Sequence, residues 1–177
     1  MVNITYHLAT PEEVKSFYIF FSETINQLFC EYSEETRKYF VEKDYNESWI
    51  NKSVEDKSKF VYLAMIDREI IGYILFGKVY GGVSMANWIA VSPTFQNQGI
   101  GKELMKLWED WALENGAHSL QLWTQDKNIS FYEKLGFSLS GKFPHAWFGA
   151  TTNLLYKTLR IVSSGEFIPK VINPKTS

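Results

Sequence analysis

Hydrophobic and polar residues follow two different periods along the chain, and each period predicts one kind of element. Alternation, or a short continuous apolar run, predicts strands over residues 3–8, 60–66, 70–80, 83–91, 119–124, 137–141 and 153–159. Apolar residues at helical spacing predict helices over residues 11–28, 33–40, 99–115 and 129–135. The stretch 43–59 is polar with Trp49 and Ile50 as apolar anchors, so both a short helix and a mobile loop fit it.

Turn signals between these segments indicate the fold class. Asp67-Arg68-Glu69 predicts a tight turn, and Gly81-Gly82 predicts a hairpin. Strands alternate with helices, and the hairpins make some strand pairs antiparallel. We therefore expect an α/β fold with a mixed central sheet of about six or seven strands flanked by helices. One domain over residues 1–159, followed by a tail or arm over 160–177, accounts for the pattern.

Composition narrows the class of protein. The chain has 177 residues, of which 45% are hydrophobic and 16% aromatic, as in a globular domain. Its net charge of −2 argues against electrostatic binding of nucleic acid. Cys30 is the single cysteine, which excludes an internal disulfide and favours a reducing, cytoplasmic location. The N-terminal segment lacks the pattern of a signal peptide, and the apolar run 17–21 is too short to cross a bilayer, so we expect no membrane association.

Two glycines lie where the helix over 99–115 begins, in the sequence QNQGIGKELM. The unpaired N–H groups of a helix N-terminus favour an anion, and glycine lets a phosphate approach the backbone. A dinucleotide fingerprint does not fit, because Leu104 stands where its third glycine belongs. A P-loop does not fit either, because Glu103 follows Lys102. The remaining alternatives are a different phosphate site and an entry turn without a ligand.

The surrounding sequence resembles a known family. Val91-x-Pro93, Gln96-x-x-Gly99-x-Gly101 and the amphipathic helix after them resemble motif A of the GNAT superfamily of acetyl-CoA-dependent N-acetyltransferases. The later segment NISFYEKLGF, residues 128–137, resembles the C-terminal motif B of the same family. The resemblance covers residues 60–159. It implies a GNAT-type sheet in which two strands, near residues 88–90 and 120–124, splay apart around the cofactor.

The resemblance also implies which residues bind acetyl-CoA. The loop and first helical turn would hold the pyrophosphate of the cofactor with their backbone. The matching positions are Gln96, Asn97, Gln98, Gly99, Ile100, Gly101 and Lys102. The strand before them would pair with the pantetheine arm through Ile89, Ala90 and Val91. The alternative for the side chains of Ile89 and Val91 is core packing.

For the chemistry, Tyr132 matches the family's general acid, which protonates the departing thiolate. Its alternative role is packing beside Phe131. Asn128 could contact the cofactor arm or cap the short helix, and Gln125 is a second candidate for the cofactor contact. The two strands that would flank the cavity carry no carboxylate, so proton removal could run through water. His145 is a candidate base or a structural residue, and no metal-ligand spacing is present, so we expect no metal.

The acceptor is expected to be an amine. In the family, the first two helices usually wall the acceptor site, and here they are acidic and aromatic, with Glu31, Glu34, Glu35, Tyr32, Tyr39 and Phe40. Carboxylates and aromatic faces suit a cation, although a solvated helix face is the alternative for each glutamate. Trp88, Trp123 and Trp147 could line the same pocket or fill the core. A small cationic amine is the first expectation; a protein or peptide amine and a non-catalytic CoA-binding module are the alternatives.

The segment after residue 159 lies beyond the family resemblance. It contains two apolar pairs, Phe167-Ile168 and Val171-Ile172, with prolines that exclude a long central strand. An extended arm on apolar surface, its own or that of a second subunit in a homodimer, is one prediction. A frayed C-terminus is the other.

Overall fold

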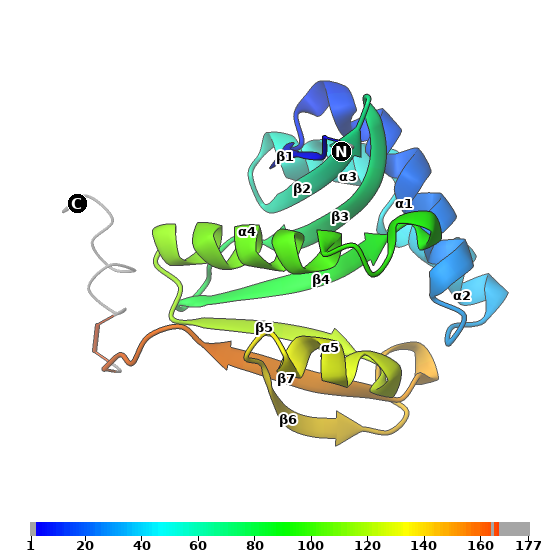
Figure 1. Cartoon of the computed structure of the whole chain (residues 1–177). Helices are drawn as coiled ribbons and strands as arrows, with labels where there is room; N and C mark the ends of the chain where they lie inside the picture. Colours follow the sequence, from blue (N-terminus) through cyan, green and yellow to red (C-terminus); the bar gives the residue numbers. More distant parts are fainter. Residues whose placement is uncertain (1–2, 164, 167–177) are drawn as a thin grey trace.

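The computed structural model describes residues 3–163 and 165–166. It contains one sheet of seven strands in the order β1-β2-β3-β4-β5-β7-β6 (Figure 1). The strands are β1 (Thr5–Leu8), β2 (Lys59–Ile66), β3 (Glu69–Gly77), β4 (Val83–Val91), β5 (Ser119–Thr124), β6 (Ser138–Phe143) and β7 (Thr152–Thr158). The α-helices are α1 (Val14–Leu28), α2 (Glu34–Tyr39), α3 (Glu47–Glu55), α4 (Ile100–Glu114) and α5 (Ile129–Glu133). The predicted mixed α/β fold is confirmed.

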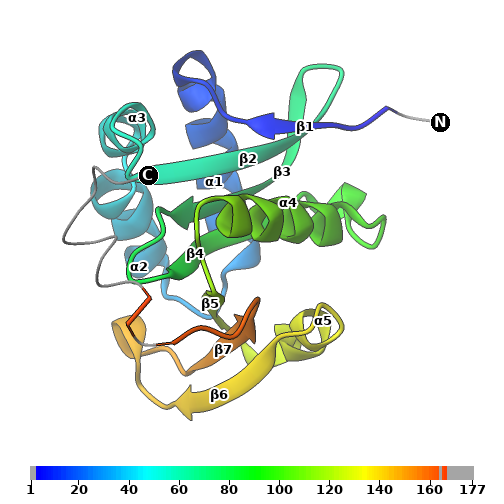
Figure 2. The same ribbon diagram turned by 90° about the vertical axis from the view of Figure 1, so that its left-hand side faces the viewer.

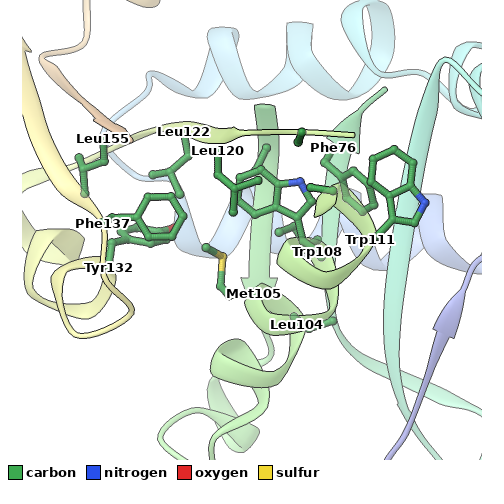
Figure 3. Packing of buried hydrophobic residues seen from close by; sticks show 14 of the residues in the cluster. Phe76, Leu104, Met105, Trp108, Trp111, Leu120, Leu122, Tyr132, Phe137 and Leu155 are labelled. Atoms are coloured by element: carbon green, nitrogen blue, oxygen red, sulfur yellow. The ribbon is translucent and has the colours of Figure 1, made fainter. Parts of the chain in front are cut away.

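Two apolar clusters cover opposite faces of the sheet. On one face, Phe17 and Phe21 of α1 pack against Tyr73 of β3, with ring centroids 5.0 Å apart for Phe17 and Tyr73. On the other face, Phe76 of β3 packs against α4, whose Trp108 is fully buried (Figure 3). Figure 2 shows α4 and α5 on the side of the sheet away from α2 and α3. The alternation of side chains along β3 therefore divides the core into two layers.

The sheet opens at its parallel pair. The ladder between β4 and β5 joins residues 83–86 to residues 119–122 and then ends. At the same place β4 carries a bulge, because Leu75 pairs with Trp88 and the next β3 residue skips Asn87. A bulge bends its strand and re-aims the residues beyond it. The strands therefore splay as expected, although the opening begins after Leu122 and leaves residues 120–122 paired.

Several predicted bounds differ from the observed ones. The return strand was expected to reach Tyr80 but β3 ends at Gly77, and Tyr80 forms an isolated bridge to Val83 around the two glycines. The polar stretch 43–59 contains a helix, α3, and the residues before it form a π-helical turn, Phe40–Asp44. The β2–β3 turn forms without glycine, since Asp67 and Arg68 take φ values of 48° and 73°.

The segment after β7 is described as far as Glu166. The backbone N–H of Leu159 donates to the carbonyl of His118 at 2.8 Å, which continues the strand for one residue. Beyond it, the side chain of Ile161 is 96% exposed. The apolar pairs 167–168 and 171–172 lie outside the described residues, so the arm and the frayed end both stay predictions. In the described part of the chain, no helix is long and apolar enough to cross a membrane.

Candidate active site

A cavity of about 1050 Å³ lies where β4 and β5 separate. Its wall combines the end of β4, the first turn of α4, the end of β5, α5, and the segment between α1 and α3. Most residues predicted to bind the cofactor or to act in catalysis line it: Ile89, Ala90, Val91, Gln96, Asn97, Gly99, Ile100, Gly101, Lys102, Asn128 and Tyr132. Gln98 is not part of this wall, because its side-chain amide donates to the carbonyl of Thr94 at 3.2 Å.

The α4 side of the cavity is shaped by backbone conformation. Gly99 is the N-cap of α4 with φ of 86°, in the left-handed region where glycine is favoured. Asn97 also has a positive φ, 62°, which asparagine tolerates better than most residues. The first helical hydrogen bond runs from the N–H of Glu103 to the carbonyl of Gly99 at 3.0 Å. The N–H groups of residues 100–102 precede it and lack helical partners, which makes this turn suited to an anion.

Two further observations concern this turn. The side-chain amide of Gln96 donates to the carbonyl of Val91 at 3.0 Å and ties the loop to the end of β4. A Cβ on Gly101 would lie 3.4 Å from the ring of Phe131, which is close to ordinary van der Waals contact. Packing against α5 therefore gives no strong reason for the second glycine.

Tyr132 lies in α5 and is only 5% exposed, although it lines the cavity. Its ring packs at 5.0 Å from Phe131 and 5.9 Å from Phe137, measured between centroids. Burial raises the pKa of Tyr132 to about 12, with a partial offset from the neighbouring Thr124 side chain. The hydroxyl is therefore protonated at neutral pH and can donate a hydrogen bond into the cavity.

The end of β5 is held by the start of β7. The side-chain amide of Asn153 donates to the carbonyl of Thr124 at 3.2 Å and to the carboxylate of Asp126 at 2.8 Å. The hydroxyl of Thr152 donates to the same carbonyl of Thr124 at 3.2 Å. Hydrogen bonds from Lys142 and Asn153 hold the pKa of Asp126 below its usual value. The sequence analysis did not predict these hydrogen bonds. The signal for them was the pair of adjacent polar residues, Thr152 and Asn153, at the start of the final strand.

Asn128 and Gln125 both line the cavity, so both amides stay candidates for a cofactor contact. Asn128 occupies the N-cap position of α5 but makes no capping hydrogen bond with its side chain, which contradicts the capping alternative. His145 is exposed, has φ of 52°, and does not line the cavity. A role for His145 as the base has no support from this geometry. Among the described residues, no three potential metal ligands cluster.

Trp88 of β4 is surrounded by aromatic rings on the α1 side of the cavity. Phe29 lies 5.0 Å away, Phe40 5.3 Å and Tyr45 5.6 Å, all between ring centroids and at steep interplanar angles. The π-helical turn brings Phe40 and Tyr45 to the same ring, because the N–H of Tyr45 donates to the carbonyl of Phe40, five residues back, at 2.7 Å. Trp88 is therefore a fixed wall of the cavity.

Further ring contacts complete the wall on the α1 side of the cavity. Phe148, in the connector between β6 and β7, lies 4.8 Å from the ring of Phe40 and 5.8 Å from that of Tyr39. Trp123 and Trp147 also line the cavity, which is the first of the two alternatives that the sequence left open. Sequence reasoning missed Phe29, Tyr45 and Phe148, since they come from separate segments with no shared local pattern.

The charged side chains of the cavity come from three places. Lys102 belongs to α4, and Glu31 and Asp44 belong to the segment between α1 and α3. Lys127 follows β5 and pairs with Glu31 at 3.5 Å. Burial and, second, the charge of Glu31 raise the pKa of Tyr32. Two of the predicted glutamates, Glu34 and Glu35, do not line this cavity and face a separate surface hollow beside α2.

The fold and the cavity thus define a mixed α/β protein with a large cleft between two splayed strands beside a helix N-terminus. The chain belongs to the acetyltransferase (GNAT) family, whose profile matches residues 22–137.

Two relatives share part of its length. Streptothricin acetyltransferase A of Bacillus subtilis (strain 168) is 32% identical over 131 residues, covering 71% of this chain and 69% of that protein. Streptothricin acetyltransferase of Escherichia coli is 29% identical over 100 residues, covering 55% of this chain and 58% of that protein. The match with the Escherichia coli protein thus spans less than two thirds of that relative.

Solved structures support the fold. PaiA N-acetyltransferase of Thermoplasma acidophilum, crystallised with coenzyme A, superposes with a TM-score of 0.72 at 19% identity, covering 88% of this chain and 99% of that one. Nourseothricin acetyltransferase superposes with a TM-score of 0.54 at 23% identity, covering 59% of this chain and 68% of that one.

Proposed function

We propose that this protein transfers an acetyl group from acetyl-CoA to a primary amine of a small cationic molecule. The observation that carries the proposal is one cavity that passes between β4 and β5 and differs at its two sides. Free N–H groups and Lys102 on the α4 side suit a phosphate, and carboxylates with aromatic rings on the α1 side suit a cation. The streptothricin acetyltransferases among the relatives are consistent with an amine acceptor.

The cofactor fits the α4 side. The N–H groups of residues 100–102 and the side chain of Lys102 would hold the pyrophosphate, and the opened edge of β4 at residues 89–91 would pair with the pantetheine arm. Acetyl-CoA supplies the thioester and its leaving thiolate. Gly99 fits this role because its φ of 86° forms the N-cap without a side chain in the way.

Tyr132 is the general acid in this proposal. Because its pKa is raised to about 12, the phenol stays protonated and first acts as a hydrogen-bond donor to the developing thiolate. A thiol in water has a pKa of about 8.5, so full proton transfer from this phenol requires a thiolate that is itself desolvated beside it. Proton removal from the attacking amine runs through water in the same proposal.

The test is release of free thiol from acetyl-CoA with a panel of amines. Turnover with small cationic amines and little turnover with peptides is the expected result. Turnover restricted to peptide N-termini or lysines would favour a protein acetyltransferase. Binding of acetyl-CoA without turnover of any amine would favour a regulatory CoA-binding module. A cytoplasmic location belongs to the same proposal and is checked by fractionation.

A further inference from the structure

One ion pair crosses the cavity from its α1 side to its β5 side. The ammonium of Lys127 lies 3.5 Å from the carboxylate of Glu31, and the two residues are 96 positions apart in the sequence. Glu31 follows α1, Lys127 follows β5, and both line the cavity. The pair therefore lies within the space that an acceptor would enter.

The two partners differ in exposure. The side chain of Glu31 is 19% exposed, whereas that of Lys127 is 59% exposed. The carboxylate is thus the more shielded of the two groups, and the ammonium ends a flexible side chain that water can solvate. A partly shielded carboxylate gains more from a nearby cation than an exposed lysine gains from a carboxylate.

This difference in exposure makes it easy for another ammonium to replace Lys127 at Glu31. An ion pair with an exposed partner contributes little to stability, so release of Lys127 into water costs little. Any other ammonium that reaches Glu31 gains the same partner in a less solvated place. The attacking amine itself must be neutral to react, so the group bound by Glu31 has to be a different amine of the acceptor.

Building on the proposed function, we infer that Glu31 binds a second, non-reacting ammonium of the acceptor and that Lys127 occupies this place until the acceptor enters. Glu31 is then a specificity-determining residue, and Lys127 competes with the acceptor for its carboxylate. The acceptor class becomes molecules that carry at least two amines, one neutral at the thioester and one charged at Glu31.

Direct binding tests this inference apart from turnover. The probes are α,ω-diaminoalkanes of increasing length, with n-alkylamines of the same length as the singly charged comparison. Calorimetry on protein saturated with coenzyme A gives the dissociation constant of each. We expect wild type to prefer some diamine at least tenfold, and Glu31→Gln to remove most of that preference.

Lys127→Met keeps an unbranched side chain, one atom shorter, and removes its charge. It should tighten diamine binding about two- to fivefold, the range that weak ion pairs contribute, and should leave alkylamine binding unchanged. In a Glu31→Gln background, Lys127→Met should leave the affinity for diamines unchanged, because Lys127 no longer has a carboxylate to occupy. Lys106→Met is the matched control, since Lys106 pairs with Asp110 at 2.9 Å on α4 away from the cavity.

Absence of diamine preference in wild type, its persistence in Glu31→Gln, or equal or weaker diamine binding in Lys127→Met would each overturn the inference. Thiol release from acetyl-CoA is measured separately on the same proteins. The predicted binding pattern without thiol release would leave Glu31 as a ligand site and refute the proposed acetyl transfer. Thiol release without the pattern would refute the role of Glu31 alone.

Discussion

On the α4 side of the cavity, one short stretch, residues 96–102 without Gln98, forms the wall, whereas on the α1 side, side chains from distant segments meet around Trp88. The first wall depends on φ angles, a helix N-terminus and the absence of Cβ atoms. The second depends on the size and charge of rings and carboxylates. A backbone wall suits a ligand part that never varies, and a side-chain wall can be changed one residue at a time to suit another acceptor.

Tyr132 lies in α5, on the same side of the sheet as α4, and loss of its hydroxyl should give the largest effect. Tyr132→Phe keeps the packed ring and removes the hydroxyl, so kcat should fall by about 10²-fold or more while affinity for coenzyme A is kept. Steady-state kinetics with the amine that gives the highest turnover measures this fall in kcat. Tyr73→Phe is the control, because Tyr73 is equally buried and its hydroxyl lies 3.2 Å from that of Thr24, away from the cavity. An unchanged kcat in Tyr132→Phe would remove the residue from the chemistry.

The raised pKa of Tyr132 also predicts how stability depends on pH. The phenol titrates near 10 in the unfolded chain and at about 12 in the folded one, so between these values the unfolded state loses its proton first. The free energy of unfolding should therefore fall as pH rises above 10, by an amount on the order of 1 kcal/mol for each pH unit between the two pKa values. Urea unfolding from pH 8 to 11 should show a shallower decline in Tyr132→Phe than in wild type. Identical slopes would contradict the burial of the phenol.

Charge at the start of α4 should matter next. Gly99→Asp puts a carboxylate at the proposed pyrophosphate site, and Gly99→Asn is its uncharged match that also tolerates a positive φ. We expect Asp to weaken coenzyme A binding at least tenfold more than Asn, by calorimetry. Equal affinities for the two variants would place the phosphates elsewhere.

A substitution on the α1 side of the cavity should leave cofactor binding unchanged. Phe148→Ala removes ring contacts with Tyr39 and Phe40, worth about 0.5–1.5 kcal/mol for a ring pair, so KM for the amine should rise about two- to tenfold. The affinity for coenzyme A should stay the same. Tyr80→Ala is the control, since Tyr80 is an exposed ring that does not line the cavity. A loss of coenzyme A affinity in Phe148→Ala would show that the two sides are not independent.

The smallest effect is expected when Asn97 is replaced by glycine. Its positive φ of 62° is relaxed in Asn97→Gly, so stability and coenzyme A affinity should change by less than about 1 kcal/mol. Asn97→Val forces a β-branched residue into the same conformation and should cost about 1–3 kcal/mol of stability. Thermal unfolding compares the two. A destabilised glycine variant with a stable valine variant would refute the backbone explanation.

The elements beside the cofactor side were the most predictable. β4 and β5 have the predicted bounds, and α4 lies one residue inside its prediction at each end, because apolar period and glycine stops are local signals. The loop over residues 96–102 was predictable for the same reason, because its residues are contiguous in the sequence. The assignment of these residues to the cofactor stays a prediction.

The acceptor side was less predictable because its determinants are not local. Phe40 and Glu31 were named because the resembled family walls its acceptor site with the first two helices. Tyr45 and Phe148 reach the cavity through a π-helical turn and a strand connector that no period marks. The bulge at Asn87, which aims Trp88, has no signal in its own strand. The pairing of Glu31 with Lys127 spans 96 positions and becomes visible only in three dimensions.

The π-helical turn at residues 40–44 has an evolutionary consequence. Such a turn is equivalent to one residue inserted into a helix, and the hydroxyl of Tyr18 stabilises it by donating to the carbonyl of Val41 at 3.3 Å. Deleting one residue there would restore an ordinary helix and turn every residue after it by about 100°. A single codon gain or loss here would therefore move Tyr45 away from Trp88 and leave Phe29, which precedes the turn, in place. Length variation at this turn is then a second route, beside substitution, by which acceptor preference can diverge.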